Sequence, residues 1–255
     1  MRYTLQVQYI GKNYAGSQIQ FENGIEIQTP TIQGELEKAI STLIFGDTEN
    51  NNRQLKTVFS GRTDRGVNSK GQIIHFDTDK PIVASKFVYQ LNEILPKDIS
   101  VSDLKQVDAS FHAQKSAKRR FYRYVFINRK CKNAFDGDLM RIKYDINIER
   151  MQNALNYLLG EHDFSSFKSS GTLNPSKVCF IEKAECKKDG DFVIIDIVGN
   201  RFLYNMVRTI VGTLLEIEGH NRSAEYMKQG LEACDRKKAG QTVSPHGLTL
   251  MKAEY

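Results

Sequence analysis

A short glycine-bounded segment, Gly61 to Gly66, places one carboxylate between arginines. It reads G-R-T-D-R-G, with Arg62, Asp64 and Arg65 lying between two apolar runs. An Asp-Arg-Gly turn can serve the backbone alone, because Asp hydrogen-bonds to its own main chain and glycine adopts positive φ. The same residues would also suit a carboxylate that acts on an anionic ligand held by the arginines. The segment by itself leaves both interpretations open.

The densest run of positive charge lies between Lys115 and Lys132, a stretch that contains no acidic residue. Phe121, Tyr122 and Tyr124 lie among its basic residues. Cations neutralise phosphates and aromatic rings stack on unpaired bases, so the mixture suits nucleic acid. It suits equally well an edge strand whose aromatic side chains face the core. In that case alternation places Tyr122 on a sheet surface, on the same face as Tyr124 and Phe126.

Two further arginines, Arg201 and Arg208, occur in the segment Gly199 to Gly212. On a helix beginning at Arg201, their side chains would lie within about 20° of one face and about 10 Å apart along the axis. Neighbouring phosphates or a carboxylate could be their target. Exposed charge on the outer face of an otherwise apolar helix is the alternative.

The composition favours a globular protein with a polyanionic partner. Over 255 residues, Lys+Arg 36 against Asp+Glu 30 gives a net charge of +6. The four cysteines form no C-x-x-C pair, which predicts no metal site and a reducing cytoplasmic environment. No apolar run approaches the about 18 residues that a membrane span needs, and no signal peptide is visible, so no membrane association is expected. The absence of a P-loop or dinucleotide fingerprint predicts no nucleotide cofactor.

Apolar periodicity predicts the elements that position these residues. The first half shows the order β-α-β-β-α-β, with the Asp64 turn between two strands and the polar segment Asp47–Asn52 as an exposed loop. The strands are expected at 2–9, 56–59, 71–76 and from residue 99, and the helices at 32–43 and 87–95.

The second half repeats this order at the level of elements, although no sequence repeat is visible. Strands are expected at 120–127, 177–186, 192–198 and 247–255, and helices at 147–159, 202–217 and 223–234. The predicted fold class is therefore α+β, with two split β-α-β halves of the ferredoxin or RRM-like kind. The halves are expected at 1–105, which carries Asp64, and at 106–255, with a mixed or antiparallel sheet.

Several segments in order resemble the tRNA pseudouridine synthase A family along nearly the whole chain. The most specific is "GRTDRGV" followed by "GQIIHF", and others are "YIGKNYAGSQIQ", "LNEILPKDISV", "FHAQKSAKRRFYRY", "RFLYNMVRTIVG" and "PHGLTLMKAEY". The resemblance implies that Asp64 is the catalytic nucleophile and that Tyr122 contacts the target base. It also implies a central RNA-binding cleft between the halves, a homodimer, and activity without cofactor or metal.

By this resemblance the substrate is tRNA, at uridines of the anticodon stem-loop just 3′ of the anticodon. Arg62, Arg65, Arg201 and Arg208 are candidates to bind this anionic strand, and Arg62 and Arg208 could instead pair with Asp64 and keep it ionised. Pseudouridine formation would follow extrusion of the uridine from the stack. The sequence departs from the usual family pattern at four places, Ser17, Arg65, Asn68 and Gln114. The changes at Arg65 and Asn68 point to an alternative, a related enzyme that modifies another structured RNA such as ribosomal RNA. A non-catalytic RNA-binding protein is a further alternative.

Overall fold

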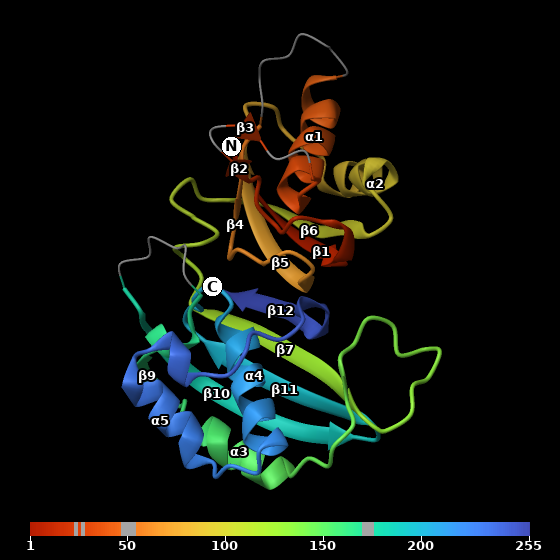
Figure 1. Cartoon of the computed structure of the whole chain (residues 1–255). Coiled ribbons are helices and arrows are strands. Elements are labelled where there is room, and N and C mark those ends of the chain that lie inside the picture. The colour runs from red at the N-terminus through yellow and green to blue at the C-terminus, as the bar shows by residue number, and fades with distance from the viewer. Residues whose placement is uncertain (23–24, 27–28, 47–54, 170–175) are drawn as a thin grey trace. The chain divides into compact units, whose positions relative to one another are not determined.

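The computed structural model describes residues 1–22, 25–26, 29–46, 55–169 and 176–255. It shows an α+β protein made of two compact units (Figure 1). The first unit comprises Met1–Lys118 with Leu250–Tyr255, and the second comprises Arg119–Thr249. The predicted fold class is confirmed. The segment Asp47–Asn52, expected as a loop, lies outside the described residues.

The sheet of the first unit is built around β1 (Arg2–Tyr9). This strand lies between β5 (Asn68–Asp77) and β6 (Ile99–Val107) and is antiparallel to both, while β4 (Thr57–Phe59) pairs with the other edge of β5. The alternation seen in the sequence sets the faces, because Tyr3, Leu5, Val7 and Tyr9 are all buried. The turn with Asp64 connects β4 to β5.

Two helices cover one face of this sheet, α1 (Ile32–Phe45) and α2 (Ala84–Ile94). Leu36 of α1 and Leu91 of α2 belong to one hydrophobic cluster with Leu5 of β1. Leu5 pairs with Ile74 of β5, which belongs to the same cluster. The hydroxyl of Thr31 accepts a hydrogen bond from the Gly34 N–H at 3.1 Å and so caps the start of α1. The apolar faces of the strands and of the two helices therefore pack into one hydrophobic core.

The second unit contains four antiparallel strands that pair in the order β7, β11, β10, β9. Its long strands are β7 (Arg119–Asn128), β10 (Val178–Asp189) and β11 (Phe192–Gly199), and its helices are α3 (Ile148–Asn156), α4 (Met206–Gly219) and α5 (Glu225–Ala233). The closing strand β12 (Leu248–Glu254), most of which belongs to the first unit, was also predicted.

Some elements were not foreseen from the sequence because they are too short to show periodicity. These are β2 (Phe21–Glu22), β3 (Ile25–Glu26), β8 (Arg141–Ile142) and β9 (Gly160–Asp163). One helix begins later than predicted, since α4 starts at Met206 rather than at residue 202.

The segment after β6 packs back onto the first unit. The Arg2 guanidinium donates to the carbonyls of Ala109 and Phe111, at 2.6 and 2.7 Å, and the Lys118 N–H donates to the carbonyl of Glu254 at 2.7 Å. The structure thus keeps residues up to Lys118 with the first unit, whereas the sequence-based division ended the first half at residue 105.

Within the described residues, no helix is both long and apolar enough to span a lipid bilayer.

Candidate active site

The turn that carries Asp64 leaves the sheet directly after β4 and returns as β5. The Ser60 N–H still donates to the carbonyl of Ile73 at 2.8 Å, and the Val67 N–H closes the turn on the carbonyl of Asp64 at 3.1 Å. Gly66 has φ +80°, which is the backbone reason for glycine at this position. Asp64 is half-buried, and Arg62 is exposed. Both features of the sequence are therefore present, a tight turn and an accessible carboxylate.

Ser17 holds the residue before Asp64, Thr63, through both its backbone N–H and its backbone carbonyl. Its Oγ accepts a hydrogen bond from the Thr63 N–H at 2.8 Å, and its own N–H donates to the Thr63 carbonyl at 3.0 Å. Ser17 is fully buried. A side chain without an oxygen here would leave a buried N–H without its acceptor. This departure from the usual family residue thus has a structural role of its own.

Tyr9, at the end of β1, holds the side chain of the same threonine. The hydroxyls of Tyr9 and Thr63 lie 2.7 Å apart. Burial raises the pKa of Tyr9 to about 12, so its hydroxyl stays protonated at neutral pH. The Tyr9 side chain therefore contacts Thr63 as a neutral hydroxyl and adds no negative charge next to the turn.

The segment from Gly11 to Gly16 approaches the turn too closely for larger residues. A Cβ on Gly11 would lie 2.1 Å from the carbonyl oxygen of Val67, and one on Gly16, where φ is +128°, would lie 3.0 Å from that of Thr63. The Gly11 N–H donates to the Oδ1 of Asn68 at 2.9 Å, so this second departure is also used structurally.

Gln72, fully buried in β5, supports the beginning of the turn. Its Oε1 accepts from the N–H of Ser60 at 3.1 Å and also from its hydroxyl, and its Nε2 donates to the Gly61 carbonyl at 2.8 Å. The backbone that leads into Asp64, from Ser60 to Thr63, is therefore held by hydrogen bonds to Gln72 and Ser17. Such support holds a reactive group in one geometry. Sequence reasoning missed the supporting role of Tyr9, Ser17 and Gln72, although Ser17 stood out as a departure from the family pattern. Only the glycines of "YIGKNYAGS" could have indicated a close approach.

Tyr122 lies on β7 in the second unit, opposite Ile197 of β11. It is only 8% exposed, and its ring meets that of Phe202 edge to face, with the centroids 5.0 Å apart. Tyr124 and Phe126 are buried with it, as the alternation predicted. The ring therefore forms part of a sheet surface and does not project from a loop.

Arg208 is held in the first turn of α4. Its Nε donates to the Val243 carbonyl at 2.8 Å, and its NH1 donates to the Oδ1 of Asn205 at 2.6 Å. Asn205 precedes the helix in the left-handed conformation, with φ 62°. The prediction that Arg201 shares a helical face with Arg208 is wrong, because Arg201 lies five residues before α4 begins.

Several arginines of the basic stretch bind acids within the second unit. Arg123 forms two bonds with Asp196, at 2.7 and 2.8 Å, and Arg119 lies 2.8 Å from Glu182. Arg129 contacts two aspartates. The exposed residues of the stretch include four lysines, Lys115, Lys118, Lys130 and Lys132. The aromatic side chains of the stretch face the core, as the structural interpretation expected, but β7 is not an edge strand, because β11 and β8 pair with its two sides. The exposed lysines add a basic surface.

The candidate residues fall into two groups. Arg62, Asp64 and Arg65 share the turn of the first unit, whereas Tyr122, Arg201 and Arg208 belong to the second unit. Among the described residues, no three histidine, cysteine or acidic side chains gather in a way that could hold a metal ion.

Comparison with known proteins identifies the family to which these features belong. The chain is 42% identical to the tRNA pseudouridine synthase A of Anoxybacillus flavithermus, over 98% of this chain and 96% of that protein. The chain belongs to the tRNA pseudouridine synthase A family. Relatives of the same name from Thermoanaerobacter sp. and Francisella philomiragia are 41% and 37% identical, over 98% and 99% of this chain and 97% and 93% of their own lengths.

The family model described as tRNA pseudouridine synthase matches residues 154–255, which lie almost wholly in the second unit. The Asp64 turn lies outside that match. The structure is also similar to a chain of a Cbf5–Nop10–Gar1 complex, with a TM-score of 0.40 and 9% identity, over 97% of this chain and 48% of that one. Similarity to the family therefore rests on the near full-length relatives.

Proposed function

We propose that this chain converts uridine to pseudouridine in tRNA and that Asp64 is its catalytic residue. Membership of the tRNA pseudouridine synthase A family supports the reaction. The observation that carries the assignment of Asp64 is its place in a turn fixed by buried hydrogen bonds from Ser17 and Gln72. A half-buried carboxylate in such a turn is accessible to a substrate and restricted in its geometry.

The reaction is an isomerisation, so atoms and electrons balance within the nucleotide. The bond from N1 of uracil to C1′ of ribose breaks, the base turns, and a bond from C5 to C1′ forms. The hydrogen on C5 leaves as a proton, and N1 gains one. A carboxylate suits this change because covalent catalysis divides one difficult step into two. Asp64 would attack the ribose, add to C6 of uracil, or remove a proton from C2′.

The remaining candidates bind the substrate. Arg62 and Arg65 flank Asp64 in the turn, and their charge suits the phosphates next to the target nucleotide. Arg208 is oriented by Val243 and Asn205, which suits a fixed contact with phosphate or carboxylate. Arg201 supplies a further cation. The Tyr122 ring packs against the uracil once the base has left the stack, which costs a few kcal/mol.

We place the modified uridines in the anticodon stem-loop, just 3′ of the anticodon. Another structured RNA, such as ribosomal RNA, is the alternative that the departures at Arg65 and Asn68 favour. Pseudouridine mapping of all RNA from cells with and without the protein decides between them. Loss of pseudouridine from the anticodon arm alone supports the proposal, loss from ribosomal RNA supports the alternative, and no loss from any RNA contradicts both.

We also propose that the enzyme is a cytoplasmic homodimer, in which one protomer grips the body of the RNA while the other modifies it. Its four cysteines are free thiols, two of them buried, which suits a reducing compartment. Sedimentation should show a dimer at micromolar protein concentration. A monomer under these conditions contradicts the proposed assembly.

A further inference from the structure

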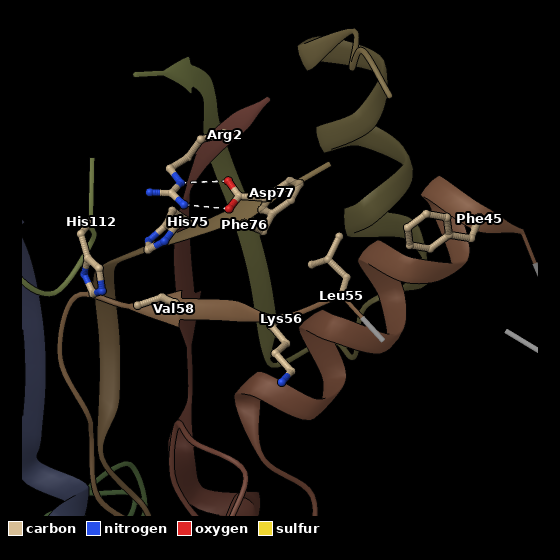
Figure 2. A pocket seen from close by; sticks show the side chains of 9 residues that line it. All are labelled: Arg2, Phe45, Leu55, Lys56, Val58, His75, Phe76, Asp77 and His112. Carbon is tan, nitrogen blue, oxygen red and sulfur yellow. Dashed lines mark hydrogen bonds and ion pairs between the residues drawn. The ribbon is translucent and has the colours of Figure 1, made fainter. Parts of the chain in front are cut away.

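A second polar site lies in the first unit, away from the Asp64 turn. It is a cavity of about 550 Å³ at the end of β5 near Asp77, lined among others by Arg2, Lys56, His75 and His112 (Figure 2). The Asp64 turn leaves the sheet at Ser60, opposite Ile73, and rejoins it at Asn68, where β5 begins. Among the described residues, those that line the cavity include none from the turn itself, 61–67. The cavity is therefore not formed by the turn that carries Asp64.

The cavity presents two imidazoles side by side whose protons are located by their hydrogen bonds. The Nδ1 of His75 accepts from the Ala113 N–H at 3.1 Å. The Nδ1 of His112 accepts from the N–H groups of Gln114 and Lys115, each at 3.2 Å, and the two rings lie 5.2 Å apart. A nitrogen that accepts carries no proton, so each neutral ring holds its proton on Nε2. Both rings are therefore hydrogen-bond donors at Nε2.

This tautomer argues against a metal ion and for an oxygen ligand. A metal needs an unprotonated ring nitrogen, and in both rings the Nδ1 lone pair is already used by a backbone N–H. Burial lowers the pKa of His75 to about 4, so that ring remains neutral at physiological pH. What the pair can bind is an acceptor such as a phosphoryl or carbonyl oxygen.

The charges around the imidazoles favour an anion. Asp77 is held by Arg2 through two hydrogen bonds, at 2.8 and 2.7 Å, and the same guanidinium donates to two backbone carbonyls. The positive charge of Arg2 thereby balances the negative charge of the Asp77 carboxylate at the rim of the cavity. Lys56 is exposed and leaves the lining with a net positive charge. Phe45 and Leu55 add an apolar end, away from the imidazoles in Figure 2.

We propose that this cavity binds the phosphoryl group of a nucleotide. The imidazole N–H groups of His75 and His112 contact the phosphoryl oxygens, Lys56 supplies the attracting charge, and the apolar end accommodates the base or sugar. The nucleotide is either part of the RNA backbone or free in solution. Binding of an RNA backbone phosphate rests on the proposed tRNA substrate, whereas binding of a free nucleotide does not.

The test is a titration of the full-length protein with uridine monophosphate, followed through the imidazole ¹⁵N signals. Both His75 and His112 should show the Nε2–H tautomer and should shift saturably, while exposed His220 serves as the internal reference. Inorganic phosphate should shift the same signals more weakly. If neither imidazole responds to millimolar uridine monophosphate, the proposed site does not exist.

Charge variants supply the second arm and separate the two sources. Lys56→Gln should weaken binding of uridine monophosphate roughly fivefold, whereas Lys86→Gln, an equally exposed lysine on α2 outside the cavity, should not. A parallel loss of tRNA affinity, with a salt slope lower by about 0.7 to 0.9, identifies an RNA phosphate as the ligand. An unchanged tRNA affinity identifies a free nucleotide. Equal effects of Lys56→Gln and Lys86→Gln on binding of uridine monophosphate would overturn the proposal. The imidazole signals report on the cavity alone, so the titration of the Asp64→Asn protein should give the same shifts whatever the role of Asp64. A failure of the cavity proposal can therefore be told apart from a failure of the proposed function.

Discussion

Hydrogen bonds between Ser17 and Thr63 join the segment after β1 to the turn carrying Asp64. The Thr63 N–H donates to the Ser17 Oγ at 2.8 Å, and the Ser17 N–H donates to the Thr63 carbonyl at 3.0 Å. Because Thr63 immediately precedes Asp64, these bonds set the direction in which the carboxylate leaves the backbone. The relationship makes Ser17 a positioning residue for the proposed reaction.

Ser17→Ala should therefore slow turnover more than it weakens tRNA binding. The change leaves the buried Thr63 N–H without its acceptor, at a cost of about 1 to 3 kcal/mol. A loosened turn misplaces Asp64, and we expect kcat to fall at least about tenfold with KM nearly unchanged. Steady-state kinetics on a tRNA transcript measure the split. The control is Ser41→Ala, since the buried Ser41 hydroxyl has no hydrogen-bond partner within the part of the chain that the structure describes. Equal kcat values for the two variants would contradict the role of Ser17.

Asp64→Asn should abolish pseudouridine formation while it preserves fold and RNA affinity. The amide is nearly isosteric with the carboxylate but is a poor nucleophile and a poor base. Filter binding and mass analysis of the product RNA measure the two properties separately. Wild-type pseudouridine formation by this variant, on any RNA, would remove the turn from the active site and leave it a plain surface turn.

Tyr122→Phe separates stacking from proton transfer. The ring packs edge to face with Phe202 in both cases, so RNA affinity should change little. Slow turnover would assign the hydroxyl a chemical role when C5 loses its proton, whereas normal turnover would leave only packing. Tyr122→Leu should impair both binding and turnover, and unchanged kinetics in the leucine variant would exclude any contact between Tyr122 and the base.

The salt dependence of RNA binding should depend more on the lysines of the 115–132 stretch than on its arginines. Arg119 and Arg123 already bind Glu182 and Asp196, so part of their charge is used within the fold. Replacing Lys115, Lys118, Lys130 and Lys132 with glutamine should lower the slope of log affinity against log salt by about 0.7 to 0.9 per lost phosphate contact. The matched comparison replaces Arg119, Arg120 and Arg123. A larger effect of these arginines than of the lysines would show that their ion pairs open when RNA binds.

The stability of the protein should fall between about pH 6.5 and pH 4 because His75 is buried in its neutral form. Burial lowers its pKa in the folded state to about 4, below the value of about 6.5 in the unfolded chain. The unfolded state therefore binds the proton first as the pH falls. The contribution of His75 is fully present above about pH 6.5, and about 2 kcal/mol of it is lost by about pH 4.5.

Urea unfolding at pH 7 and pH 4.5 measures this loss. In His75→Asn the side-chain oxygen can still accept from the Ala113 N–H, but the side chain no longer titrates, so the difference between the two pH values should shrink by about that amount. His220→Asn, at an exposed position, should leave the difference unchanged. An undiminished difference in His75→Asn would show that other groups cause the loss.

The sequence by itself determined what depends on local periodicity and on residue type. Alternation from Arg2 to Tyr9 and apolar spacing in α1 and α2 specify the elements, because a half-buried strand or helix must place its apolar residues on one side. The G-R-T-D-R-G segment likewise marks both the turn and its carboxylate. The family could be recognised from such segments because each is contiguous.

Only the tertiary structure decided which distant residues support Asp64. Ser17 lies 46 residues from Thr63 and Tyr9 lies 54 residues from it, and hydrogen bonds over such separations leave no periodic signal in the chain. The start of α4 was also decided by the tertiary structure, because the apolar periodicity extends back to Phe202 while the backbone is left-handed at Asn205 and the helix begins only at Met206. The paired imidazoles of His75 and His112 likewise meet only because the segment after β6 returns to the end of β5.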